Sequence, residues 1–95
     1  MILVRDVFQL QFGKMREALS LLGELRDIER ANGYDVTRVL TDLTGPYYTL
    51  VMESTFDGLA QYEQGLNFTD EWRAAYARFV PLVLGGHREI FRVVD

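Results

Sequence analysis

The sequence predicts an α+β domain of the ferredoxin-like class, in which a four-stranded antiparallel sheet carries its helices on one face. The first observation is the order of periodicities, because strand-like and helix-like stretches follow one another as β-α-β-β-α-α-β. The second is a short connection with Gly45 and Pro46 between the two middle strands, which makes them antiparallel neighbours. A helix before this hairpin and helices after it complete the plan. The whole chain, residues 1–95, fits one domain.

The N-terminal part of the chain predicts a strand followed by a long helix. Residues 2–10 are rich in β-forming side chains and are followed closely by Phe12-Gly13, so they are expected to form the first strand. From Lys14 to Ala31, apolar residues recur at three- and four-residue spacing between charged ones, which is typical of a one-sided amphipathic helix. The apolar positions are Met15, Ala18, Leu19, Leu22, Leu25 and Ile28. Asn32-Gly33 is a common left-handed helix end.

The middle of the chain predicts a hairpin that leads into a helix. The two strands are expected at residues 34–43 and 47–54, joined by Thr44-Gly45-Pro46. Ser54 is expected to cap the next helix, with Asp57 three residues later in a capping box.

The C-terminal part predicts a third helix and a last strand. Thr69 with the acids after it is a second helix start, because acids are favourable at the positive end of a helix. One apolar face follows, made of Trp72, Ala75, Tyr76, Phe79, Val80 and Val83. Pro81 is expected to kink or restart the helix near its end and Gly85-Gly86 to stop it, which leaves residues 87–94 as the last strand.

Composition excludes several classes of site and partner. There is no cysteine and a single histidine, His87, so we expect neither disulfides nor a metal site within one chain. The net charge is −4 and the ten basic residues are scattered among acids, which argues against nucleic acid as a partner. No apolar run approaches membrane-spanning length, and charge at Arg5 comes too early for a signal peptide. The expected location is therefore the cytoplasm.

The apolar content predicts that the chain pairs with a copy of itself. Forty-eight per cent of the residues are apolar and 13% are aromatic, and the helices can cover only one face of the sheet. Leu3 and Val7 would lie on the uncovered face, together with apolar residues of the hairpin. Two such faces packed together would form a homodimeric barrel.

Taken together, these motifs resemble the dimeric α/β-barrel superfamily, especially its antibiotic-biosynthesis-monooxygenase-like branch, and NIPSNAP-like proteins share the fold. The resemblance covers nearly the whole chain. It is carried by strand one running into Phe12-Gly13-Lys14, by Glu53 as the acid that ends the third strand, by the run Glu71-Trp72-Arg73-Ala74-Ala75-Tyr76, and by Val80-Pro81-Leu82. Members with known chemistry include cofactor-free monooxygenases that act on aromatic polyketides or quinols, and haem-degrading enzymes.

The resemblance also assigns positions, and this sequence departs from the haem-degrading pattern at each of them. Asp6 falls where those enzymes have an asparagine, Tyr62 falls near their tryptophan, and Tyr76 falls at their histidine. Because the helix lacks that histidine, the usual axial ligand is missing. The resemblance therefore implies a pocket between helices and sheet without haem, and no cofactor is expected.

Asp6 is the main catalytic candidate, together with Tyr76. Alternation places Asp6 on the same strand face as Val4 and Phe8, where a carboxylate must either be hydrogen-bonded or open onto a pocket. Desolvation would raise its pKa and suit it to proton transfer, whereas a bond to a tyrosine hydroxyl or a helix terminus would make it structural. Tyr62 and Tyr76 could direct their hydroxyls at Asp6, or they could simply be amphipathic core residues.

Three further residues could take part in binding. Trp72 lies one turn before Tyr76 and is expected to form a wall of the core or of the pocket mouth. Arg38 and Glu53 are expected to face each other across the hairpin, either as a charged pair inside a dimer barrel or as a solvated cross-strand pair. His87 is expected at the surface.

The sequence therefore supports two hypotheses of function. The first is an enzyme without a cofactor, a monooxygenase, isomerase or lyase that acts on a small aromatic or enolisable substrate, with Asp6 as proton acceptor. The alternative is a non-catalytic dimeric module that binds a small ligand or docks to other proteins. An open cavity with Asp6 and Tyr76 on its wall would favour the first, and a closed helix–sheet interface would favour the second.

Overall fold

The computed structural model describes all 95 residues and has the expected order of elements. A single 3₁₀ turn, Val80–Leu82, precedes the last strand. The helices and strands are β1 Ile2–Leu10, α1 Met15–Ala31, β2 Arg38–Thr41, β3 Thr49–Phe56, α2 Leu59–Gly65, α3 Asp70–Phe79 and β4 Val83–Arg92. The predicted ferredoxin-like fold is confirmed.

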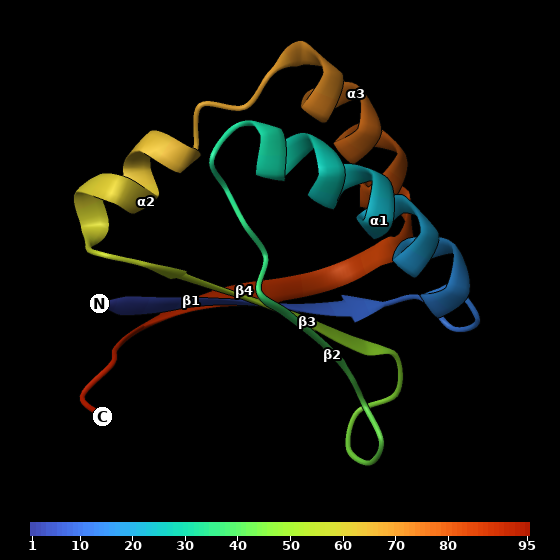
Figure 1. The fold of residues 1–95 in the computed structure, drawn as a ribbon. Coiled ribbons are helices and arrows are strands. Elements are labelled where there is room, and N and C mark those ends of the chain that lie inside the picture. The colour runs from blue at the N-terminus through green and yellow to red at the C-terminus, as the bar shows by residue number, and fades with distance from the viewer.

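The four strands form one antiparallel sheet in the order β2-β3-β1-β4. All three helices lie on one side of this sheet, while the β2–β3 hairpin projects beyond its other side (Figure 1). Side chains alternate along β1, so even-numbered residues face the helices and odd-numbered residues face away from them. The sheet thus has a helix-covered face and a helix-free face.

Two groups of buried side chains join the helices to the sheet. The larger one packs α1 and α3 against β1 and β3, and its most buried members are Leu10, Ala18, Leu22, Leu50 and Phe79. The smaller one lies beneath α2 and contains Val4, Tyr34, Val36, Phe56 and Tyr62. Most of the apolar stripe expected for α1 packs on the sheet, but Leu19 was wrongly included, since it is exposed, and Leu21 is buried in its place.

Three boundaries predicted from the sequence are wrong. The first strand of the hairpin was expected at residues 34–43 but covers only Arg38–Thr41. Ser54 does not cap α2, because β3 continues to Phe56 and buries Ser54; the N-cap of α2 is Gly58. Gly85-Gly86 does not end α3, because both glycines lie within β4. Gly86 is needed there because a Cβ at this position would collide with the carbonyl oxygen of Val7 on β1.

The other helix ends follow the expected chemistry. The chain leaves α1 through Gly33, which adopts a left-handed backbone with φ of 82°. The Thr69 hydroxyl caps α3 by accepting a 3.1 Å hydrogen bond from the backbone N–H of Trp72. Asp70 and Glu71 occupy the first turn of α3.

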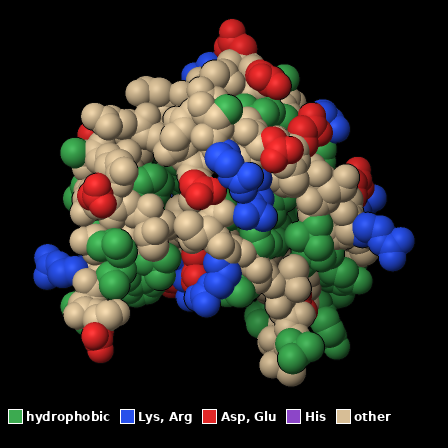
Figure 2. Space-filling model, viewed as in Figure 1, with side chains coloured by type: hydrophobic (Ala, Val, Ile, Leu, Met, Phe, Trp, Pro, Cys, Tyr) green, Lys and Arg blue, Asp and Glu red, His purple; other side chains and the backbone are tan.

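Acidic and basic side chains are interspersed over the surface, with hydrophobic side chains exposed between them (Figure 2). No helix combines the length and the apolar character that crossing a membrane requires.

Candidate active site between helices and sheet

A small cavity lies between the helix layer and the covered face of the sheet. It encloses about 80 Å³ and is lined by residues of β1, α1, α3 and β4, among others. Its charged lining residues are Asp6, Glu29 and Arg88, and its aromatic lining residues are Phe8, Tyr34, Phe68, Trp72 and Tyr76. Three of the residues expected to form a site, Asp6, Trp72 and Tyr76, therefore meet on this wall.

Asp6 is paired with an arginine of the neighbouring strand. The antiparallel register places Asp6 of β1 opposite Arg88 of β4, and Arg88 Nε donates a 2.6 Å hydrogen bond to Asp6 Oδ1. Arg88 Nη1 also donates a 2.6 Å hydrogen bond to the hydroxyl oxygen of Tyr62. Tyr62 thus reaches Asp6 through Arg88 rather than directly, and the pair ties α2 to the sheet.

Glu29 is the second carboxyl group of the cavity, and it has no ion-pair partner. It lies on α1 with only 8% of its surface exposed. Burial raises its pKa to about 7; the neighbouring indole N–H of Trp72 and the charge of Arg26 oppose this rise, and the charge of Asp6 adds to it. Arg26 does not bind Glu29, because its Nη2 donates a 2.8 Å hydrogen bond to the carbonyl oxygen of Val36.

The aromatic wall of the cavity is a stack of three rings. Trp72 lies between Phe68 and Tyr76, with ring centroids 3.9 Å and 4.7 Å away and interplanar angles of 11° and 12°. The Nε1 atom of Trp72 is buried beside the Glu29 carboxyl group, and it makes no hydrogen bond of normal geometry. The Tyr76 hydroxyl makes no hydrogen bond to Asp6, so Tyr76 contributes its ring to the wall.

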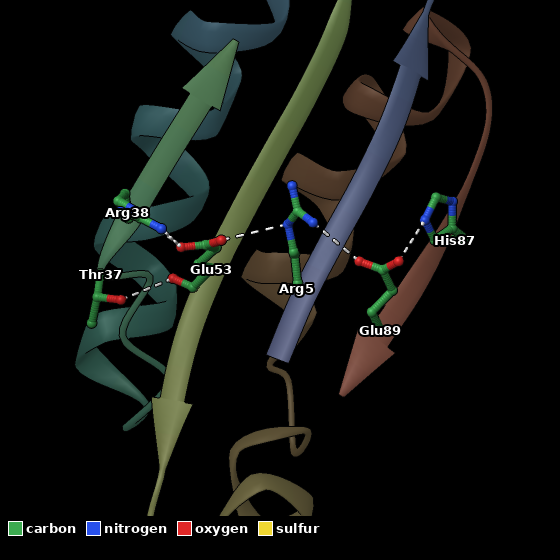
Figure 3. Close-up of polar contacts among 6 residues, drawn as sticks. All are labelled: Arg5, Thr37, Arg38, Glu53, His87 and Glu89. Atoms are coloured by element: carbon green, nitrogen blue, oxygen red, sulfur yellow. Dashed lines mark hydrogen bonds and ion pairs between the residues drawn. The ribbon is translucent and has the colours of Figure 1, made fainter. Parts of the chain in front are cut away.

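The remaining predicted residues, Arg38 and Glu53, lie on the opposite, helix-free face. The register pairs them as expected, with an Arg38 Nη2 to Glu53 Oε1 distance of 2.6 Å. Figure 3 shows the chain of ion pairs that continues across the sheet. We call it the charged row: Arg38, Glu53, Arg5, Glu89 and His87. The predicted site residues therefore form two separate groups on the two faces of one sheet.

Two cavity residues, Glu29 and Arg88, were not predicted from the sequence. Glu29 follows Leu22 by seven residues and Leu25 by four, so its spacing alone places it on the apolar face of α1. The sequence therefore did contain a signal that Glu29 is buried. Arg88 carried no comparable signal, because its position opposite Asp6 depends on the register between the first and last strands.

The cavity can do proton-transfer chemistry with its own side chains. One carboxyl group, Glu29, is able to gain and lose a proton near neutral pH, and a paired carboxylate, Asp6, lies close enough to influence it. No group of three or more His, Asp or Glu side chains is arranged to hold a metal ion.

Comparisons with known proteins agree with the fold. No protein-family model matches the sequence, and no curated protein matches it. Among solved structures, a NIPSNAP-domain protein of Burkholderia xenovorans is 17% identical with a TM-score of 0.84, over 99% of this chain and 95% of the other. A NIPSNAP-family protein of Agrobacterium tumefaciens is 19% identical with a TM-score of 0.83, over 99% and 93%.

An antibiotic biosynthesis monooxygenase is also similar, with 16% identity and a TM-score of 0.75 over the full length of both chains. At such identities the likeness concerns the fold and not the activity. The chain thus has the fold of NIPSNAP-domain and antibiotic biosynthesis monooxygenase structures, as its sequence motifs indicated.

Proposed function

We propose that the protein catalyses proton transfer on a small enolisable molecule bound in the helix–sheet cavity, with Glu29 as the proton acceptor. The observation that carries this proposal is a buried carboxyl group in a cavity wall, without an ion-pair partner and with a pKa of about 7. A general base is most effective when its pKa lies near the working pH. Perturbed acids of this kind concentrate at functional sites.

Glu29 suits this role better than Asp6, which was the candidate from the sequence. Arg88 Nε already lies 2.6 Å from Asp6 Oδ1, so the Asp6 carboxylate is engaged by a donor within the protein. Asp6 then has an indirect role, because its negative charge helps to raise the pKa of Glu29. Tyr76 and Trp72 act as walls that hold the substrate.

The size of the cavity favours small substrates over aromatic ones. A volume of about 80 Å³ is roughly half of the ~150 Å³ of an engineered cavity that binds benzene. A three- or four-carbon carbonyl compound is therefore the better match, while an aromatic ring would require side chains to move. An isomerase or lyase needs only the proton transfer. One structural neighbour is named as an antibiotic biosynthesis monooxygenase. A monooxygenase reaction without a cofactor would let the same carbanion react with oxygen.

A non-catalytic ligand-binding module is the second candidate. It is favoured by the pairing of Asp6 with Arg88 and by a cavity below the usual ~300–1,000 Å³ of ligand pockets.

Deuterium exchange separates the two candidates. We expect the protein to speed the exchange of the α-protons of hydroxyacetone in D₂O, followed by proton NMR, and Glu29→Gln to abolish this activity. Asp27→Asn, an exposed acid on the same helix, is the matched control and should retain it. Equal exchange rates with and without the wild-type protein, over a panel of small ketones and aldehydes, would leave the binding module as the function.

We also propose that the helix-free face packs against a second copy of the chain. Apolar side chains that are partly or fully exposed flank the charged row there, namely Leu3, Val7, Leu40 and Phe91. A face of this kind is an aggregation site in water, and a stable partner should bury well over 1,000 Å² with it. Light scattering at micromolar concentration should give twice the chain mass of 11.0 kDa, and Val7→Glu should give a monomer. A folded wild-type monomer would contradict the proposal.

A further inference from the structure

The indole N–H of Trp72 is a buried donor that lies beside the Glu29 carboxyl group but makes no hydrogen bond of normal geometry with it or with any other group. The rings of Phe68 and Tyr76 stack on its two faces, so the indole is not free to turn toward another partner. A buried donor left without a partner costs about 1–3 kcal/mol. Because Trp72 forms part of the cavity wall, a bound molecule is the natural source of the missing acceptor.

The charges around this donor define the molecule that fits. Two carboxyl groups, those of Asp6 and Glu29, line the cavity, and its one cation, Arg88, is committed to Asp6 and Tyr62. An anionic ligand would meet net repulsion there. A neutral molecule with an oxygen acceptor would supply what Trp72 lacks without adding a charge.

We infer that Trp72 binds the carbonyl oxygen of a small neutral aldehyde or ketone that carries an acidic α-C–H bond, an inference that rests on the proposed function. In the reaction the α-C–H bond breaks, the proton forms an O–H bond on the Glu29 carboxylate, and the electron pair moves into an enolate with its charge on oxygen. Return of the proton to carbon restores the carbonyl compound and Glu29.

This arrangement would favour the reaction and not only the binding. Trp72 lies close enough to Glu29 for its N–H to lower the pKa of that carboxyl group. During proton transfer the negative charge moves from Glu29 to the enolate oxygen. A fixed N–H beside both groups can stabilise the negative charge as it forms on the enolate oxygen. A hydrogen-bond donor contributes most to catalysis where charge develops in the transition state.

The contact can be observed directly because Trp72 is the only tryptophan of the chain. In ¹⁵N-labelled protein its indole N–H gives a single signal. Titration with hydroxyacetone should shift this signal downfield until it saturates, whereas acetate, a small anion, should leave it in place. An unmoved signal at saturating hydroxyacetone, or a shift with acetate alone, would overturn the inference.

Trp72→Phe adds a kinetic test, because it keeps a ring in the stack and removes the N–H. Loss of a comparable donor lowers kcat about 100- to 1,000-fold, and we expect α-proton exchange to fall by at least the lower factor with a smaller change in KM. Exchange within about twofold of the wild type would contradict the inference. If the variant does not fold, the titration of the wild-type indole decides alone.

The outcomes also separate this inference from the proposed function. Exchange catalysis with an unmoved indole signal would retain Glu29 as a base and remove Trp72 from the site. A saturable indole shift without any exchange would support the carbonyl contact and contradict proton transfer.

Discussion

Two glutamates lie on opposite sides of the same sheet and are buried to the same degree, yet they have different surroundings. Glu29 is 8% exposed and Glu53 is 6% exposed. Glu53 has Arg38 at 2.6 Å and Arg5 at 3.5 Å, whereas Glu29 makes no ion pair. Burial alone therefore does not identify a reactive carboxyl group; the number of cations that contact it does.

The difference follows from the elements that carry the two residues. On the helix-free face, antiparallel register brings one residue from each strand into line, so that charges of alternating sign meet across β2, β3, β1 and β4. Glu29 instead projects from α1 into the helix–sheet layer, where it lines a cavity whose walls are mostly hydrophobic. The first environment stabilises a charge, and the second opposes it.

The largest expected effect is on the pH dependence of stability. The pKa of Glu29 is about 7 in the folded chain against 4.5 for an ordinary Glu, so the folded state binds more protons between these values. The stability from this group is fully present below pH 4.5 and is lost as the pH rises through 7, a change of about 3 kcal/mol. Urea unfolding of the wild type and Glu29→Gln should give profiles that diverge over this range, with the variant more stable at pH 8.

Asp27→Asn is the control for this comparison, because it removes an exposed acid from the same helix and should run parallel to the wild type. Parallel profiles for the wild type and Glu29→Gln would mean that folding leaves the pKa of Glu29 at its ordinary value of 4.5.

The same change at Glu53 should have the opposite sign. Glu53→Gln removes the carboxylate that Arg38 contacts and leaves Arg5 with Glu89 alone, and we expect a loss of about 2 kcal/mol at pH 8. This is below the ~3–5 kcal/mol of a fully buried pair, because both arginines stay partly in solvent. Urea unfolding at fixed protein concentration measures it. A neutral or stabilising result would show that the charged row contributes nothing to the folded chain.

The smallest effect is expected when the same pair is broken from its exposed side. The side chain of Arg38 is 64% exposed, and Glu53 retains Arg5 when Arg38 is removed. Arg38→Ala should therefore lower the free energy of unfolding by about 0.5 kcal/mol in the same assay. A loss as large as that of Glu53→Gln would mean that Arg5 does not support Glu53.

The fold could be predicted from the sequence because its signals are local. The apolar spacing of α1, the Gly45-Pro46 turn and the Thr69 cap each depend on a few neighbouring residues. The errors arose where a local signal competed with the sheet. Ser54 has the chemistry of a cap but is held in β3 by pairing with β1. Gly85-Gly86 resembles a helix end, but both residues lie in β4, where Gly86 allows close approach to β1.

The candidate site could be predicted only in part, for the same physical reason. Asp6, Trp72 and Tyr76 were placed on the helix-covered side by periodicity, and the structure brings them to one cavity. The partner of Asp6 depends on which residue of β4 lies opposite it, and only the three-dimensional register determines that. Glu29 was overlooked because a glutamate in a helix is usually solvated, although its spacing from Leu25 marks the buried face.

The central claim is that Glu29 exchanges its proton near neutral pH, and a carbon NMR titration of its side-chain carboxyl group tests it most directly. The signal is assigned by its absence in Glu29→Gln and followed from pH 3 to pH 9. A midpoint of about 7 is the result that the structure predicts. A midpoint near 4.5, the ordinary value for a glutamate, would contradict both the contrast with Glu53 and the proposed proton transfer.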